Sequence, residues 1–70
     1  MMEFELEGSE YIELNKLLKI LNLAESGGEA NFRITEGEII VNKQVELQKR
    51  KKLRAGDIVE CDGIEIKIIE

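Results

Sequence analysis

The dipeptide Asp62-Gly63 lies between two alternating runs of apolar and polar residues, one ending at Cys61 and the other beginning at Ile64. Two such runs joined by Asp-Gly predict a β-hairpin, because both positions of a type I′ turn need a positive φ that these residues tolerate. A two-residue turn also fixes the register, so Cys61 should face Ile64 and Val59 should face Ile66. One side of this hairpin is therefore apolar, and the fold has to cover it.

The N-terminal part of the chain predicts one strand followed by one helix. Residues 3–7 alternate with period two, as in a half-buried strand, and Gly8 ends the run. Ser9 is a favourable N-cap for a helix that we expect to end near Asn22. Lys16 falls off the apolar face of this helix and should be exposed. That face has three- and four-residue spacing and consists of Tyr11, Leu14, Leu17, Leu18 and Leu21.

A second, shorter helix is predicted to begin after Ser26. Ser26 and Glu29 have the spacing of a capping box, Ala30 and Ile34 form a small apolar face, and Gly37 offers a stop. The glycines that follow Ser26 could also let a phosphate approach the free N–H groups of the first turn. We favour the simple cap, because the carboxylate of Glu29 would repel a phosphate.

The middle of the chain predicts one strand and then an irregular basic segment. Residues 39–41 are β-branched, which favours a strand. Asn42 is expected to shape the turn after that strand. Residues 42–55 lack clear periodicity and predict a basic loop, with Val45 and Leu53 as its anchors to the core.

Together these elements predict an α+β fold, in which two antiparallel helices pack on a small, mostly antiparallel β-sheet. Seventy residues make one domain, here residues 1–70. A chain of this length buries only about 60% of its unfolded surface, which leaves little room for a buried active site. No apolar run approaches a membrane span and no secretory signal is evident, so we expect a cytoplasmic protein, and a monomer.

Charge is strongly segregated along the chain. Residues 42–54 carry six cations against Glu46, a local net charge of +5 in a chain whose net charge is −5. Four of these cations are consecutive, in residues 49–52, whereas residues 1–13 carry five Glu and no cation. A binding footprint is a local electrostatic field, so a basic segment on an acidic body suggests a polyanion such as nucleic acid, bound on one side only.

The residues needed for common catalytic and metal sites are missing. The chain has no His and a single Cys, so it offers neither a Cys-His pair nor a zinc-ligand set, and we expect no cofactor. Cys61 lies on the inward side of the hairpin, where a buried, inert thiol is expected. The sequence therefore favours a protein that binds over one that catalyses.

The order of motifs resembles a known family. The chain begins this series with a predicted helix, which is followed by Ser-Gly-Gly-Glu-Ala at residues 26–30 and a second predicted helix. After the second helix come Glu-Gly-Glu-Ile-Ile-Val-Asn-Lys, the basic loop, and Leu-Arg-Ala-Gly-Asp-Ile-Val. This order is similar to the small RNA-binding module first described in the fourth protein of the ribosomal small subunit, also called the alpha-L motif. The opening at Ser26 and the short chain suggest its stand-alone bacterial branch.

The resemblance implies that structured RNA, ribosomal RNA above all, is the partner, and that no reaction is catalysed. By position in the family's motif, the implied RNA-binding residues lie on the two helices and the basic loop: Lys16, Asn31, Lys43, Lys49, Arg50, Lys51 and Lys52. The second helix departs from the pattern at Gly27 and Asn31, where many members carry Arg, so more weight falls on residues 43–54. The three aromatics, Phe4, Tyr11 and Phe32, are expected at the core or its edge. Recognition should then use RNA shape and backbone rather than base stacking.

Two alternatives of another class remain open at this point. The acidic face of the hairpin could make the chain a protein-interaction adaptor. The string from Ile39 to Val59 also resembles β-grasp sulfur carriers, but these end in Gly-Gly, whereas this chain ends Ile68-Ile69-Glu70, so carrier chemistry is not expected. Retention on heparin at low salt would separate an RNA-binding module from an acidic adaptor.

Overall fold

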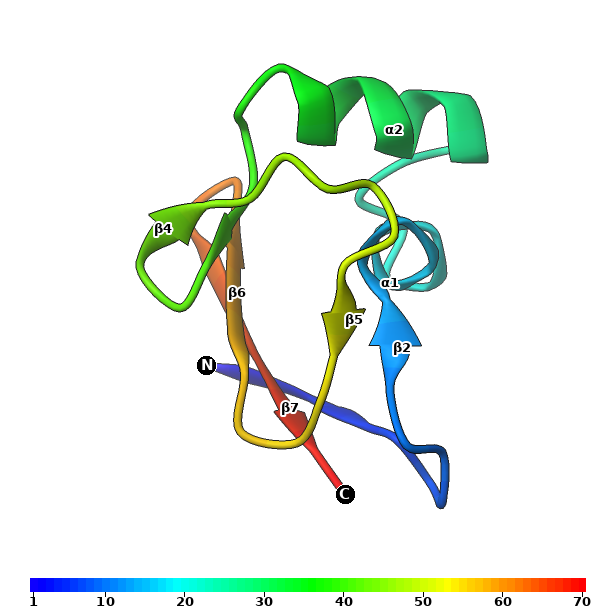
Figure 1. Ribbon diagram of the computed structural model, residues 1–70, viewed down its shortest axis with the longest axis vertical. Coiled ribbons are helices and arrows are strands. Elements are labelled where there is room, and N and C mark those ends of the chain that lie inside the picture. Colours follow the sequence, from blue (N-terminus) through cyan, green and yellow to red (C-terminus); the bar gives the residue numbers. More distant parts are fainter.

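The C-terminal hairpin stands at the centre of a five-stranded sheet with the order β1-β7-β6-β3-β4, and a separate pair joins β2 to β5. The computed structural model describes residues 1–70. Two α-helices, α1 (Leu14–Ile20) and α2 (Gly27–Thr35), complete the fold (Figure 1). The strands are β1 (Met2–Glu5), β2 (Ile12–Glu13), β3 (Ile40–Val41), β4 (Gln44–Val45), β5 (Lys52–Leu53), β6 (Ile58–Cys61) and β7 (Ile64–Ile69). The α+β class with two helices and a mostly antiparallel sheet is confirmed.

The hairpin of β6 and β7 has the predicted turn and register. Asp62 and Gly63 both have positive φ, 55° and 76°, as a type I′ turn requires. Cys61 pairs with Ile64 and Val59 with Ile66. The side chains that this register turns inward belong to the core, so the local signal in the sequence was sufficient here.

The core lies between one face of the five-stranded sheet, the two helices and Leu53 of β5. Figure 1 looks along α1 and shows α2 from its side, so the two helices cross where they pack. Neither helix has the length and apolar character needed to cross a bilayer. The fully or almost fully buried side chains are Leu6, Leu14, Leu17, Leu18, Ala24, Ala30, Ile34, Ile39, Val41, Leu53, Val59, Cys61, Ile66 and Ile68.

The first helix begins later than the sequence predicted. Ser9 is not its N-cap; the helix begins at Leu14, and Glu13 occupies the N-cap position. The preceding residue pair, Ile12 and Glu13, instead forms a short strand that pairs with β5, about 40 residues further along the chain. This long-range pairing overrides the local helical pattern. At the other end Asn22 has a φ of 59°, a left-handed conformation that ends the helix close to the predicted place.

The second helix begins and ends as predicted. The Ser26 hydroxyl accepts a hydrogen bond from the Glu29 N–H at 3.2 Å, and the Glu29 carboxylate accepts one from the N–H of Glu25. Ser26 therefore caps the helix as predicted, whereas the Glu29 carboxylate reaches the N–H of Glu25 rather than that of Ser26. Gly37, with a φ of 79°, terminates the helix after Glu36.

The basic segment is more ordered than a loop. Asn42 and Lys43 form a two-residue turn with positive φ at both positions, which joins β3 to β4. Leu53 is fully buried and anchors the segment as predicted, but Val45 is 57% exposed, so its predicted role as an anchor is wrong. The reason is that Val45 lies on β4, the edge strand of the sheet, where no element covers it.

Candidate nucleic-acid interface

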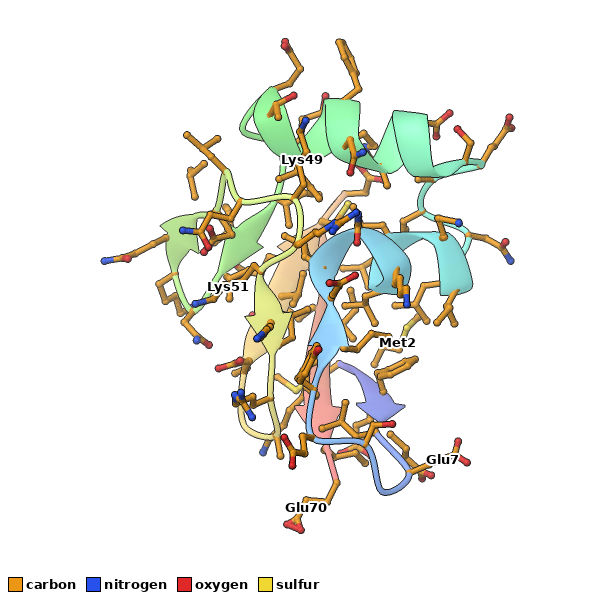
Figure 2. All side chains as sticks on the ribbon, turned by 45° about the vertical axis from the view of Figure 1, so that its right-hand side comes forward. Met2, Glu7, Lys49, Lys51 and Glu70 are labelled. Atoms are coloured by element: carbon orange, nitrogen blue, oxygen red, sulfur yellow. The ribbon has the colours of Figure 1, made fainter.

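Main-chain atoms of the basic segment cap the N-terminus of α1. The first N–H groups of a helix have no partner within it, and Glu13 makes no side-chain cap. The Leu14 N–H donates to the carbonyl of Lys51 at 2.9 Å, and the Asn15 N–H donates to the carbonyl of Lys49 at 3.1 Å. The basic segment is thereby fixed to the helix through main-chain hydrogen bonds, which do not depend on the identity of its side chains. Figure 2 labels Lys49 and Lys51 on this segment, between α2 and β5.

Asn15 also connects this attachment to the second helix. Its side-chain Nδ2 donates to Asn31 Oδ1 at 3.3 Å. Asn15 therefore contacts Lys49 through its main chain and Asn31 through its side chain. Its own Oδ1 is buried and has no hydrogen-bond partner. The predicted residue Asn31 is half-buried and lies next to the start of α1 and the backbone of Lys49.

The structure brings six of the seven predicted residues together around the start of α1. Lys16 is exposed on the first turn of that helix, and Asn31 faces it from α2. Lys49 and Lys51 are attached to the helix by their carbonyls, Arg50 lies between them, and Lys52 pairs with Glu13 in the β2–β5 ladder. All of the cations are exposed except Lys51, which is half-buried.

Lys43 is the predicted residue that the structure separates from the others. It lies in the turn that joins β3 to β4, and in Figure 1 this turn is at the opposite side of the molecule from α1. Its side chain is exposed. A partner that contacts both Lys43 and the residues around α1 would therefore have to extend across the face of the molecule.

None of the cations in residues 43–54 forms an ion pair, although the chain has 15 acidic residues. Both ion pairs in the molecule belong to Arg33. The segregation of charge in the sequence is therefore largely kept in space, although Glu13 lies opposite Lys52 in the β2–β5 ladder and Glu46 lies within the segment. Exposed cations of this kind attract an anionic partner through a field that salt screens over about 10 Å at 0.1 M.

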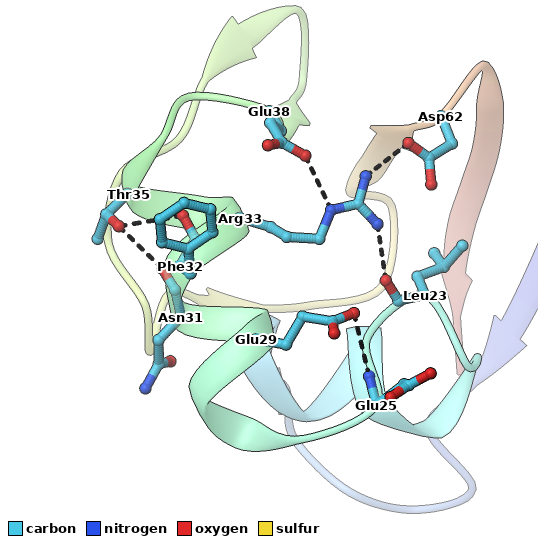
Figure 3. Close-up of polar contacts among 9 residues, drawn as sticks. All are labelled: Leu23, Glu25, Glu29, Asn31, Phe32, Arg33, Thr35, Glu38 and Asp62. Atoms are coloured by element: carbon cyan, nitrogen blue, oxygen red, sulfur yellow. Dashed lines mark hydrogen bonds and ion pairs between the residues drawn. The ribbon is translucent and has the colours of Figure 1, made fainter.

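Arg33, the only cation of α2, is used to hold the fold together (Figure 3). Its guanidinium pairs with Glu38 at 2.9 Å, pairs with Asp62 in the hairpin turn, and donates to the carbonyl of Leu23 at 2.6 Å. The hydrogen bonds that Arg33 donates to the carboxylates of Asp62 and Glu38 raise its pKa further above its ordinary value. Sequence reasoning gave Arg33 no role, because its partners lie in separate turns. The second helix therefore presents no free cation.

The exposed aromatic side chains correct the sequence prediction. Phe4 is half-buried and packs against the core, but Phe32 is 59% exposed and Tyr11 is 36% exposed. Two cations lie over the Tyr11 ring, with Lys52 Nζ at 5.1 Å and the Arg54 guanidinium carbon at 5.6 Å from its centroid. The prediction placed all three aromatics at the core or its edge, and for Phe32 this is wrong. Aromatic rings are therefore available at the surface.

Cys61 lies on the inward side of β6, as predicted. It is buried, and burial raises the pKa of its thiol above the ordinary value. A thiol that stays protonated at neutral pH is a poor nucleophile. We therefore assign Cys61 to the packing of the core.

Comparison with known proteins gives one family and two related proteins. Residues 4–69 match the S4 domain. YbcJ of Escherichia coli (strain K12) is 36% identical over 69 residues, 99% of each chain. RlbA of Bacillus subtilis (strain 168), named a probable ribosome maturation protein, is 36% identical over 55 residues, 79% of this chain and 78% of its own. The solution structure of YbcJ, described as having an alpha-L motif involved in RNA-binding, superposes with a TM-score of 0.74 over 100% of this chain and 89% of that one.

Proposed function

Because the chain belongs to the S4 domain family and has the alpha-L motif fold, we propose that it is a non-catalytic protein that binds structured RNA. One observation carries the proposal. The cations of residues 49–52 are held at the start of α1 by main-chain hydrogen bonds and are free of ion pairs. Their charge is thus available to a partner, and the backbone that carries them is in place before the partner arrives.

The proposed contacts are with phosphates. Lysine and arginine neutralise phosphates and release condensed counterions, which gives affinity but carries no information on base sequence. Lys16, Lys49, Arg50, Lys51 and Lys52 would make these contacts, with Asn31 beside them and Lys43 reaching a more distant part of the RNA. Selectivity would come from the shape of folded RNA and its 2′-hydroxyl groups, which DNA lacks.

We further propose that the RNA is ribosomal and that the protein works in the cytoplasm. The support is that RlbA, a related protein of similar length, is named a probable ribosome maturation protein. We take the monomer as the working form.

The test compares two cations that carry the same charge at different places. Arg50 is exposed on the basic segment, whereas Lys67 is exposed on β7, between the buried residues Ile66 and Ile68 and therefore on the outer face of the sheet. Arg50→Ala should weaken binding to an RNA hairpin several-fold, and Lys67→Ala should leave it nearly unchanged. Equal effects of the two variants would mean that only overall charge matters. No binding by the unmodified protein would favour an acidic protein-interaction adaptor.

A further inference from the structure

The β2–β5 ladder has one face toward the core and one toward solvent. Ile12 pairs with Leu53, and both side chains pack into or against the core. Side chains alternate between the two faces of a strand, so the neighbours of this pair face outward. Those neighbours are Tyr11 and Glu13 on one side and Lys52 and Arg54 on the other.

This outward face combines an aromatic ring with two cations that form no ion pair, and with Glu13, which lies opposite Lys52. Lys52 Nζ and the Arg54 guanidinium carbon lie 5.1 and 5.6 Å from the centroid of the Tyr11 ring. Neither cation forms an ion pair. The two cations lie over the ring, so a stacking base would take their place on it and leave them to meet its phosphates, and Tyr11 keeps 36% of its surface exposed. An aromatic ring beside cations is the chemistry that binds a single-stranded nucleotide, because the ring stacks on the base and the cations meet its phosphates.

The same face is continuous with the surface already assigned to RNA. Lys52 follows directly after Lys51, whose carbonyl caps α1. Phe32, the other exposed aromatic, lies on α2 and has no Lys or Arg over its ring. Of the two exposed rings, Tyr11 is therefore the one placed beside phosphate-binding groups.

We propose that Tyr11 is a stacking platform for one unpaired nucleotide next to the structured part of the RNA, with Lys52 and Arg54 at its phosphates. The proposal rests on the proposed function and adds a substrate feature to it. The nucleotide has to be unpaired, because a base inside a helix is already stacked on both faces and cannot reach a protein side chain. The preferred RNA is thus a hairpin with a short single-stranded extension.

The experiment uses the fact that Tyr11 is the only tyrosine in a chain without tryptophan, so intrinsic fluorescence reports on this ring alone. Affinity and fluorescence are measured with a blunt RNA hairpin and with the same hairpin carrying a three-nucleotide extension. The extension should raise affinity roughly fivefold or more and quench Tyr11. Tyr11→Phe should keep this gain, and Tyr11→Leu should lose it while binding the blunt hairpin normally. Phe32→Leu is the matched control and should keep the gain.

The outcomes separate the two proposals. If Tyr11→Leu retains the gain from the extension, the stacking proposal is wrong and the proposed function stands. If Tyr11→Leu weakens both RNAs equally while circular dichroism shows an unchanged fold, the ring only positions Lys52 and Arg54, which also overturns stacking. If the unmodified protein binds neither RNA, the proposed function fails and this proposal fails with it.

Discussion

Asn42 and Asp57, 15 residues apart, close the two ends of the basic segment with a hydrogen bond of 3.0 Å from Asn42 Nδ2 to Asp57 Oδ1. Each side chain also binds main chain. Asn42 Oδ1 accepts from the Ile58 N–H at 2.9 Å, and Asp57 Oδ2 accepts from the Arg54 N–H at 2.8 Å. The cations between these residues are therefore presented by a closed segment, which reduces the conformational freedom that binding would otherwise have to remove.

Asn42→Ala should lower the free energy of unfolding by about 2 kcal/mol. It removes two side-chain hydrogen bonds, and alanine is less tolerant than asparagine of the φ of 50° at this position. For a domain of this size the midpoint of thermal unfolding should fall by roughly 10 °C. Lys43→Ala is the control: it has the same kind of backbone, with a φ of 72°, but its side chain makes no hydrogen bond. Equal effects would show that the side-chain bonds of Asn42 do not matter.

The pair of Asp62 and Arg33 predicts a pH dependence of stability. The hydrogen bond from Arg33 holds the pKa of the Asp62 carboxyl below its ordinary value of 3.8. The folded state thus binds this proton less readily than the unfolded state. The stabilisation is fully present above the unfolded pKa and is lost as the pH falls through the lower folded pKa.

Asp62→Asn should make thermal stability fall less steeply with acid, measured from pH 6 to pH 2, because asparagine has no carboxyl to protonate and still tolerates the positive φ of the turn. Glu10→Gln, which removes an exposed carboxylate that forms no ion pair and lies outside the helices and strands, is the control and should leave the profile parallel to that of the unmodified protein. An Asp62→Asn profile that also runs parallel would contradict the assigned role of Arg33.

The N-cap of α1 offers a stabilising substitution. Glu13 has the extended backbone of an N-cap residue, but its side chain caps nothing. Carbonyls of the basic segment accept from the N–H groups of Leu14 and Asn15, and the N–H of Lys16 is the next one in the helix. A side chain shorter than that of Glu13 could accept a hydrogen bond from it. Glu13→Asp should raise the free energy of unfolding by about 0.5–1 kcal/mol, measured by urea denaturation. Glu10→Asp, outside any helix, should have no effect, and a similar gain there would point to a cause other than capping.

Salt should weaken RNA binding in a defined way. If about three to five phosphate contacts carry the binding, log affinity should fall linearly with log salt with a slope of roughly −2 to −4. Arg50→Ala should reduce the slope by about one for every RNA sequence tested, because a phosphate contact carries no base information. Hairpin RNA should also outcompete DNA of the same sequence. A flat salt profile, or equal affinity for DNA, would favour the adaptor.

The features that were predicted correctly from the sequence depend on neighbouring residues. The hairpin turn at Asp62-Gly63 and the cap at Ser26 each need only a few residues whose backbone preferences agree. The basic character of residues 49–52 is equally visible in the sequence. Local patterns of this kind are sufficient for the α+β class and for locating the candidate site along the chain.

The features that were missed depend on residues far apart in the sequence. Tyr11 has helical spacing relative to Leu14, which predicted that it would face the core. In the structure Ile12 pairs with Leu53 and faces the core, so Tyr11 beside it faces outward. No residue near Tyr11 in the sequence indicates this pairing. The bond between Asn15 and Asn31 and the capping of α1 by loop carbonyls also require the assembled fold. The cations could thus be named from the sequence, but their shared position at the start of α1 could not.

Because carbonyl groups of Lys49 and Lys51 cap α1, the side chains at these two positions can be substituted without loss of the cap. Every amino acid has a carbonyl, so α1 keeps its cap whatever side chains occupy these positions. Proline at position 51 is the evident exception, because the Lys51 N–H donates to the carbonyl of Gln48. Natural variation or directed selection could therefore retune which RNA is bound, or how tightly, with little loss of stability. Residues 49–52 are the natural place to begin a library of variants with new binding preferences.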